Sequence, residues 1–525
     1  MKSYAANIFS NLRAVPVWLL ALLTLVIIGN VISWWVIDIH PDEAYYWAWS
    51  VYPDLSYFDH PPMVAWLIWL VSKTIGINDV TLRLPAFAAW LVAAWVVYSV
   101  SSRLFGNKSY GWLALLIYCM LPVFQAASHI VTPDSPLLLF IALTYYFLFV
   151  ALRENNNKVW LVAGLCVGLA LLSKYNTVLI PVSAFTGMVL TVRGRQILAT
   201  PWPWAAIVLS GVVFTPVVMW NYLHDWASFS YQVGHGIRPE KHFSLEFLWI
   251  YIGGQLGAAL LWVMVAMMVA TFRVRQRDNE SNSAYIAVLA SGFWVPLIFF
   301  GYAGSTTIGQ VNWPAMAYLP GTILLAGLLG KYVAPGFSNL QAGPLPGRRQ
   351  LLHYRILVFV LIFSCLFSVS LINMFRFPNE ARKLGVAVLP TNTQISDTFG
   401  WQTLASEIRA FRSENGLPAN CRTAVSTRYI WGSMIYRFRD ISQFVMLSDK
   451  VDSQYAFWKS EGIFPAANTC MVIERLPHEK TGYAKNRQWP GLGEWLLVKT
   501  IVVPTSDTPR VYGFYLPASM QKRKT

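Results

Sequence analysis

Charged residues are scarce in this chain, and acidic residues are the scarcest. Only 12% of the 525 residues carry charge, 56% are hydrophobic, and 25 acids stand against 40 bases. This composition excludes an ordinary soluble globular protein. The chain also lacks internal repeats, a coiled-coil pattern and the short alternating segments of a β-barrel. Its apolar residues instead form blocks of about 20, the length that crosses a hydrocarbon layer, which predicts a polytopic α-helical membrane protein.

Cysteine is rare as well, with five residues in the whole chain. Cys119, Cys166 and Cys365 fall within apolar blocks, where cysteine behaves as a small apolar residue. Cys421 and Cys470 each open a strand-like run in the C-terminal part. An exported tail would permit a disulfide between them, but spacing does not determine distance, so a bridge and two free thiols both stand as alternatives.

We expect about 11–13 transmembrane helices. The first apolar block, Val15 to Ile37, is too long for the core of a signal peptide and precedes no small-residue cleavage site, so it predicts a retained first helix. The spans that we draw are 15–37, 85–103, 110–127, 136–152, 159–173, 176–192, 203–222, 246–272, 284–302, 313–333 and 354–375.

Basic residues gather in alternate loops and thereby predict the topology. One set of inter-helix loops is rich in Lys and Arg, and the positive-inside rule makes that side, with the N-terminus, cytoplasmic. The opposite set carries few, namely Lys73, Arg83, Lys174, Arg238 and Lys241. The net charge of +15 therefore reflects topology and contact with membrane lipids, and no nucleic acid partner is expected.

The composition changes after about residue 375. We predict a transmembrane core over 1–375, with a long first exported loop at 38–84, and an extracytoplasmic α/β domain over 376–525. The tail should contain a helix at Trp401–Ser413 and short strands. These strands are expected at Thr423–Thr427, Gln443–Leu447, Met471–Glu474, Leu496–Val503 and Val511–Tyr515.

The first exported loop concentrates the rare acids. Six of the thirteen acids before residue 376 lie in it, and carboxylates beside a bilayer are costly unless they are solvated, paired or used. Asp42 and Glu43 are adjacent, so one can act as a general base while the other binds a cation or holds a neighbour in place. The alternative is structural, because acids in a first helical turn favour the helix dipole.

A second motif in this loop is Tyr57-Phe-Asp-His-Pro-Pro. The two prolines should start an interfacial helix that ends near Ile75 and place Asp59 and His60 at its N-terminus, where anions bind readily. His60 could meet a phosphate or a metal ion. Helix capping by Asp59, with His60 exposed, is the structural alternative.

These two motifs, taken in order with several later ones, resemble a known family. The later segments are Arg83-Leu-Pro, Thr132-Pro-Asp-Ser-Pro, Leu172-Ser-Lys-Tyr, the segment from Trp220 to Gln232, and Asn312-Trp-Pro-Ala. The set is similar to bacterial protein-mannosyltransferase-like enzymes (glycosyltransferase family 39) and the related lipid A aminoarabinose transferases, all of the GT-C superfamily. The resemblance covers residues 1 to about 375.

The resemblance implies an inverting enzyme that takes a sugar from a polyprenyl-phosphate donor on the periplasmic face of a bacterial inner membrane. Asp42 matches the first-loop acid regarded as catalytic, with Asp59 and Glu43 as further catalytic candidates. Where the aminoarabinose transferases carry Glu-Lys, this chain has Asp59-His60, and Tyr45 replaces an Arg, so two cations are lost.

Cleavage of such a donor leaves a phosphate that needs positive charge. The candidates for donor and phosphate binding are His60, Lys174, Arg83, Arg238, Tyr45 and Tyr46, with Asp134 and His235 as further site candidates. Whether a divalent metal ion is required is open, and Asp59 with His235 would be its ligands. The histidine spacing matches no standard zinc pattern.

The predicted function is therefore sugar transfer to an envelope acceptor: lipid A, another glycolipid or a polysaccharide, with protein as a less favoured acceptor. The alternative is a transporter or flippase of lipid-linked sugars, which would use the same residues to bind a headgroup. A transporter should show inverted repeats or broken helices at corresponding positions, and the sequence shows neither. The sugar, the acceptor and the oligomeric state do not follow from the sequence.

Overall fold

The structure is a computed structural model that describes residues 17–154, 156–236, 242–274, 280–338, 352, 355–356, 358–368, 399–447, 453–460, 468–476, 486–489, 492–504 and 509–521. It divides into two compact units. The first contains residues 1–32, 60–63 and 83–372, and the second contains residues 33–59, 64–82 and 373–525. The boundary predicted near residue 376 lies outside the described residues.

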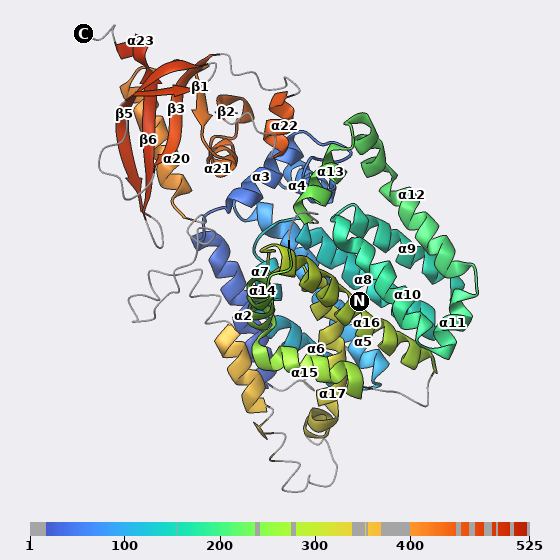
Figure 1. The fold of residues 1–525 in the computed structure, drawn as a ribbon. Coiled ribbons are helices and arrows are strands. Elements are labelled where there is room, and N and C mark those ends of the chain that lie inside the picture. Colours follow the sequence, from blue (N-terminus) through green and yellow to red (C-terminus); the bar gives the residue numbers. More distant parts are fainter. Residues whose placement is uncertain are drawn as a thin grey trace. The chain divides into compact units, whose positions relative to one another are not determined.

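The first unit is helical (Figure 1). Its helices pack closely where small residues meet: a Cβ on Gly164 would lie 2.4 Å from the Ala206 carbonyl oxygen, so α9 and α12 approach to backbone contact. The helices are α2 (Val17–Val36, which continues into the second unit), α5 (Leu84–Leu104), α6 (Lys108–Met120), α7 (Pro122–Ala127), α8 (Asp134–Glu154), α9 (Asn157–Leu171), α10 (Leu179–Val189), α11 (Val192–Leu198), α12 (Trp202–Leu223), α13 (Ala227–Gly236), α14 (Leu245–Ala259), α15 (Leu261–Arg273), α16 (Glu280–Thr306) and α17 (Tyr318–Ser338), with short 3₁₀ turns η1 (Thr81–Arg83), η2 (Tyr175–Val178) and η3 (Ala315–Ala317).

Several of these helices have the length and composition of membrane spans. Within the described residues, four are long and apolar enough: Thr81–Leu104, Asp134–Arg153, Trp202–Leu223 and Glu280–Thr306. Counting the bent pair α14 and α15 as one span gives five, and shorter apolar helices such as Asn157–Leu171 accompany them. The helical class of the predicted core is confirmed.

Two predicted spans are interrupted. The predicted span 110–127 divides into α6 and α7, because Pro122 cannot continue the helix that precedes it. The predicted span 246–272 is bent by 93° between α14 and α15. Leu260, at this break, has a φ of 63°, a left-handed conformation that a helix cannot contain.

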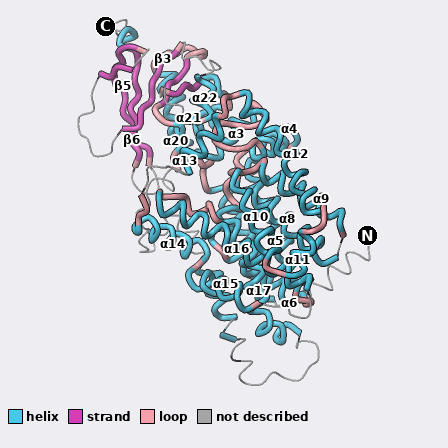
Figure 2. Tube along the Cα trace, turned by 45° about the vertical axis from the view of Figure 1, so that its right-hand side comes forward, coloured by secondary structure: helices cyan, strands magenta, loops and turns pink. Residues whose placement is uncertain are grey.

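The second unit contains a sheet, whose strands are magenta in Figure 2. The sheet has six strands in the order β2-β1-β3-β6-β5-β4. Strand β1 pairs in parallel with β2 and β3, and the other neighbours are antiparallel. The predicted strands and the predicted helix at Trp401–Ser413 are present, whereas β4 and the helices α21 and α22 were not predicted. The elements are α20 (Trp401–Glu414), β1 (Arg422–Val425), α21 (Arg428–Phe438), η5 (Ile441–Gln443), β2 (Phe444–Met446), α22 (Gln454–Ser460), β3 (Thr469–Leu476), β4 (Asn486–Trp489), β5 (Gly493–Val503), β6 (Arg510–Pro517) and α23 (Ala518–Gln521).

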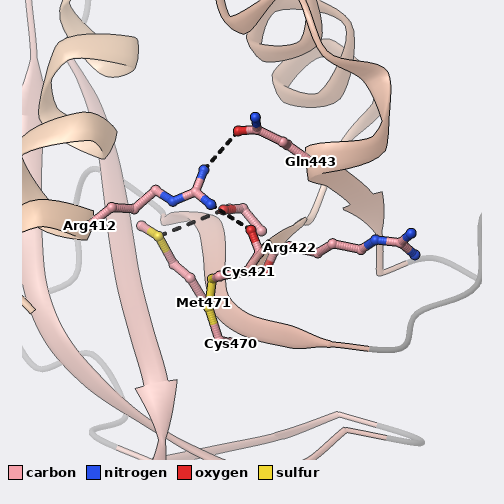
Figure 3. Close-up of a disulfide and its surroundings, with 7 residues drawn as sticks. Arg412, Cys421, Arg422, Gln443, Cys470 and Met471 are labelled. Carbon is pink, nitrogen blue, oxygen red and sulfur yellow. Dashed lines mark hydrogen bonds between the residues drawn. A yellow bond between two sulfur atoms is a disulfide. The ribbon is translucent and has the colours of Figure 1, made fainter. Parts of the chain in front are cut away.

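A disulfide joins two of these strands. Cys421, at the start of β1, is bonded to Cys470 of β3, with 5.6 Å between the Cα atoms. Arg412 of α20 donates from Nη1 to the Gln443 side chain at 3.0 Å and from Nη2 to the Cys421 carbonyl oxygen (Figure 3). The alternative of two free thiols is therefore wrong.

Most of the first exported loop, residues 38–59 and 64–82, also belongs to the second unit, although the sequence placed the loop in the membrane core. It supplies α3 (Pro41–Val51) and α4 (Met63–Thr74), the helix predicted to follow the two prolines. Helix α3 crosses α21 at Gly432, where an added Cβ would lie 3.2 Å from the Pro41 carbonyl oxygen. Glycine thus allows the backbones of α3 and α21 to lie close together, and a larger residue at this position would push them apart.

Two acids of the loop join it to the tail. Asp38 accepts the backbone N–H groups of Trp401 and Gln402 at 3.1 and 3.3 Å, which caps the N-terminus of α20, and it also pairs with Arg437. Asp79 accepts from the Tyr436 hydroxyl at 2.9 Å and pairs with Arg437 at 3.1 Å. The cost of placing these acids here is offset by partners that lie about 360–400 residues further along the chain.

Candidate functional site

Asp42 is positioned by a capping box at the start of α3. Its backbone N–H donates to Nδ1 of the N-cap residue His40 at 3.2 Å, and the His40 N–H donates to the Glu43 carboxylate at 3.0 Å. Glu43 is completely buried, whereas the Asp42 side chain is 39% exposed. The two adjacent carboxylates thus have different roles: Glu43 holds the helix start, and the Asp42 side chain remains partly exposed.

His40 does not occupy the Asp42 carboxylate. The two side chains are 3.6 Å apart, but Nδ1 already accepts the Asp42 N–H, so in this tautomer it has no proton to donate to the carboxylate. Asp42 therefore retains the lone pairs that a general base requires. A purely structural role, helix capping, accounts for the Glu43 side chain. For Asp42 it accounts only for the backbone N–H and leaves the carboxylate without a structural role.

Asp59 lies in a closed environment in the same unit. It is 6% exposed and accepts a hydrogen bond from the Tyr45 hydroxyl at 2.6 Å. Tyr45 in turn accepts the backbone N–H of Gln454. Burial and then the charge of Asp59 hold the pKa of Tyr45 well above its usual value, so the phenol stays protonated and keeps donating.

Arg428 is a candidate residue that the sequence did not reveal. It begins α21, and although burial opposes its charge, the hydrogen bond to Tyr429 comes first among the contacts that raise the Arg428 pKa above its usual range, and the charge of Asp59 adds to it. A permanent cation therefore acts on Asp59 from the tail, while the local positions expected to carry cations hold His60 and Tyr45. No nearby motif signals this, because 369 positions separate Asp59 from Arg428.

Aromatic side chains fill the space behind these acids. Trp49 is fully buried and stacks on Tyr57 with ring centres 4.4 Å apart. Tyr46, predicted to contact the donor, is 8% exposed and lies edge-on to Trp49 at 4.9 Å. This packing makes the acidic loop a rigid part of its unit rather than a free connection.

The first unit contains a second polar cluster. The Lys174 ammonium pairs with one Asp134 carboxylate oxygen at 2.8 Å, and the Asn312 side-chain amide donates to the other at 2.7 Å. Asp134 begins α8, and Lys174 directly precedes η2, so three segments distant in sequence converge. The predicted candidates Lys174 and Asp134 are thus brought together, and Asn312 joins them.

The other predicted residues of the first unit are placed individually. Arg83 is 2% exposed, directly before α5, and His60 is half-buried. His235 lies in α13, but its side chain and all of Arg238 lie outside the described residues. The predicted metal pair of Asp59 and His235 is therefore not described as a pair.

One of the histidines near α13 has a structural role. His224 contacts the Trp220 carbonyl oxygen through Nδ1 at 2.7 Å. In the described parts of the chain, no three His, Cys, Asp or Glu side chains gather in a group that could hold a metal ion.

Comparison with known proteins confirms the predicted resemblance. The family model described as dolichyl-phosphate-mannose-protein mannosyltransferase matches residues 59–220. A lipid A galacturonosyltransferase of Rhizobium johnstonii is 28% identical over 306 residues, which cover 56% of this chain and 61% of that protein. An undecaprenyl phosphate-α-4-amino-4-deoxy-L-arabinose arabinosyl transferase of Erwinia tasmaniensis is 23% identical over 57% of this chain and 54% of that protein.

The chain thus spans a little more than half the length of these relatives. The solved structures extend the likeness of fold to nearly the whole chain. ArnT from Cupriavidus metallidurans, in the apo state, superposes with a TM-score of 0.60 at 15% identity and covers 96% of this chain and 98% of its own. The predicted GT-C fold, a helical core with a C-terminal sheet domain, is the fold that this likeness shows.

Proposed function

We propose that this protein transfers a sugar from a polyprenyl-phosphate donor to an acceptor of the bacterial envelope. The observation that carries the proposal is Asp42, an open carboxylate on a helix start that a capping box fixes. One relative is named a lipid A galacturonosyltransferase and another an undecaprenyl phosphate-α-4-amino-4-deoxy-L-arabinose arabinosyl transferase, and both names support this chemistry. One ArnT structure contains undecaprenyl phosphate.

In the proposed reaction, an acceptor hydroxyl attacks the anomeric carbon from the face opposite the phosphate, which inverts that centre. Asp42 accepts the hydroxyl proton as the new glycosidic bond forms and the bond to the phosphate oxygen breaks. The polyprenyl phosphate leaves with the bonding electron pair. An acceptor phosphate would need no base, so a hydroxyl acceptor makes the strongest use of Asp42.

The remaining residues act in support. Glu43 holds Asp42 at the helix start, Tyr45 donates a hydrogen bond to Asp59, and Arg428 is the cation of the tail that acts on that carboxylate. Lys174 is the cation that we assign to a lipid phosphate, with Asp134 and Asn312 as the groups that position it. His60, Arg83, Arg238 and Tyr46 stay as predicted contacts of the donor.

The proposal places the protein in the inner membrane with 11–13 spans, its N-terminus in the cytoplasm and its tail in the periplasm. The apolar helices and the basic residues of alternate loops support this placement. The disulfide between Cys421 and Cys470 supports an oxidising compartment for the tail. Lipid A or another glycolipid is the favoured acceptor.

The test is Asp42→Asn, assayed in membranes with polyprenyl-phosphate donors that carry 4-amino-4-deoxyarabinose or galacturonic acid. Asp54→Asn is the matched control, since it removes an exposed carboxylate from the same loop. Loss of a general base should slow transfer by roughly 10²–10⁴-fold while donor binding persists. Undiminished transfer by Asp42→Asn would refute the assignment, and absence of transfer by the wild-type protein with both donors would count against this donor class.

A further inference from the structure

Asn312, which donates to Asp134, lies on a connecting segment. Residues 307–314 join α16 to η3 and contain no regular helix. The Asn312 amide reaches one oxygen of the Asp134 carboxylate at 2.7 Å, and the Lys174 ammonium holds the other at 2.8 Å. A connecting segment positions a side chain less precisely than a helix does, so Asn312 needs support from neighbouring elements.

Gln255 of α14 supplies this support from one side. It is 3% exposed, and its Nε2 donates to the Val311 carbonyl oxygen at 3.2 Å, while its Oε1 accepts the Tyr318 hydroxyl. A carbonyl oxygen can only accept, so the Gln255 amide has a single orientation that satisfies both contacts. An added Cβ on the neighbouring Gly254 would lie 3.0 Å from the Val311 side chain, so α14 lies directly against the segment.

The bond from Gln255 acts on Asn312 through one rigid group. The Val311 carbonyl belongs to the planar peptide unit that ends at the Asn312 Cα atom. A donor fixed on this oxygen therefore fixes the plane from which the Asn312 side chain departs. Without it the peptide unit can turn, and the Asn312 amide turns away from the carboxylate of Asp134.

Asn176 supports the same segment from a second side. Its Nδ2 donates to the Trp313 carbonyl oxygen at 3.4 Å, a long hydrogen bond and thus a weaker one than that of Gln255. Asn176 follows Lys174 by two residues, in η2. The segment that carries Asn312 is thus tied both to α14 and to the part of the chain that carries Lys174.

We propose that Gln255 is a positioning residue for Lys174, the cation assigned to the lipid phosphate. Gln255 holds the Asn312 peptide unit, Asn312 and Lys174 share the Asp134 carboxylate, and this carboxylate sets the direction of the ammonium. An ammonium has three N–H donors, so the one given to Asp134 directs the others toward a phosphate. The inference rests on the proposed function, which gives Lys174 its role, and it needs no contact between Gln255 and the donor.

The test measures binding of farnesyl phosphate and of farnesol to the full chain in phosphatidylcholine nanodiscs, with binding to empty nanodiscs subtracted. Gln255→Leu should weaken binding of farnesyl phosphate by about tenfold, equivalent to 1.4 kcal/mol, and leave farnesol binding unchanged. A role in packing alone would change the binding of both probes or of neither. Gln255→Asn, whose shorter side chain withdraws from Val311 and keeps the amide, should show the same selective loss and carries the test if Gln255→Leu does not fold.

A double variant tests whether Gln255 acts through Lys174. Lys174→Met should weaken farnesyl phosphate binding by about tenfold or more, and Gln255→Leu/Lys174→Met should bind no more weakly than Lys174→Met alone. Gln125→Leu is the matched control, because Gln125 is a glutamine of the same unit that is 1% exposed and donates to the Cys119 carbonyl oxygen at 2.7 Å. It should keep farnesyl phosphate binding at the level of the wild type.

Three outcomes would overturn the inference: additive losses in the double variant, an equal loss in Gln125→Leu, or full binding of farnesyl phosphate by Gln255→Leu when Lys174→Met is impaired. The last outcome would leave the proposed function intact. Full binding by Lys174→Met would instead remove the role of Lys174 in the proposed function and the inference with it. Asp42→Asn should lose transfer and keep farnesyl phosphate binding, so the test of the general base is independent of this one.

Discussion

The pair of Lys174 and Asp134 offers the sharpest test of how the helical unit holds a charge. Their side chains are 11% and 22% exposed, and their charged atoms are 2.8 Å apart. Lys174→Met leaves Asp134 with Asn312 as its hydrogen-bond donor, whereas Asp134→Asn leaves the ammonium without its carboxylate. The double variant removes both charges together.

The cost of each single variant follows from what remains behind. Removing one partner of a buried ion pair costs about 3–5 kcal/mol, because an uncompensated charge is left out of water. The partial exposure of both side chains lowers this to roughly 2–4 kcal/mol. The double variant leaves no charge, so it should cost less than the sum of the singles, by about 1–3 kcal/mol.

The chain itself supplies the probe for the assay. Cys119, Cys166 and Cys365 are free and buried, so a dye that fluoresces on reaction with thiols reports unfolding. Each single variant should lower the apparent Tm by roughly 4–8 °C, and the double variant by less than the sum of the two. Lys73→Met, which removes an exposed lysine from α4, is the control and should leave the Tm within about 1 °C.

If the loss of stability in the double variant equalled the sum of the losses in the two single variants, the pairing would be refuted. Sugar transfer, measured on the same samples, separates stability from function. If Lys174 also binds the lipid phosphate, the double variant should be partly restored in stability and still inactive. Sugar transfer by the double variant would show that Lys174 only balances the charge of Asp134.

Three further predictions concern the second unit. Gly432→Val should lower the stability of the second unit by roughly 1–3 kcal/mol and speed tryptic cleavage, because the side chain would meet the Pro41 carbonyl oxygen. Gly432→Ala should have a milder effect, and equal effects of the two variants would contradict the close crossing of α3 and α21. Replacing Cys421 and Cys470 by Ser should cost about 4 kcal/mol in urea unfolding, given their separation of 49 residues, and reduced wild-type protein should match the variant. Asp440→Ala should destabilise the unit at neutral pH: burial opposes the Asp440 charge, but hydrogen bonds from Ser442 and Gln443 lower its pKa below the usual 3.8. The stability from a depressed carboxyl pKa is present above the unfolded pKa and is lost as pH falls through the folded one. The difference between Asp440→Ala and wild type should therefore begin to shrink near pH 3.8 and continue to shrink as pH falls through the lower folded pKa; a constant difference would contradict this.

The sequence alone determined the features that depend on local composition. Apolar blocks of spanning length predict helices, because an α-helix satisfies its backbone hydrogen bonds within one segment and needs no distant partner. The concentration of rare acids in residues 38–84 marked the loop that carries Asp42, and the prolines at 61 and 62 marked the start of α4. Short runs of strand-forming residues marked five of the six strands of the tail.

Only the tertiary structure decided how those acids are used. Asp38 and Asp79 belong to the same group of rare acids, and the structure pairs both with Arg437, whereas Glu43 completes a cap and the Asp42 carboxylate stays partly exposed. The pairs of Asp38 and Asp79 with Arg437 join positions hundreds of residues apart. No periodicity or spacing in a sequence predicts which distant residues come into contact in the folded protein. The same holds for Arg428 beside Asp59, for Asn312 on Asp134 and for the bridge between Cys421 and Cys470. In the folded protein, Arg437 and Arg428 of the tail supply positive charge to the acids of the first exported loop.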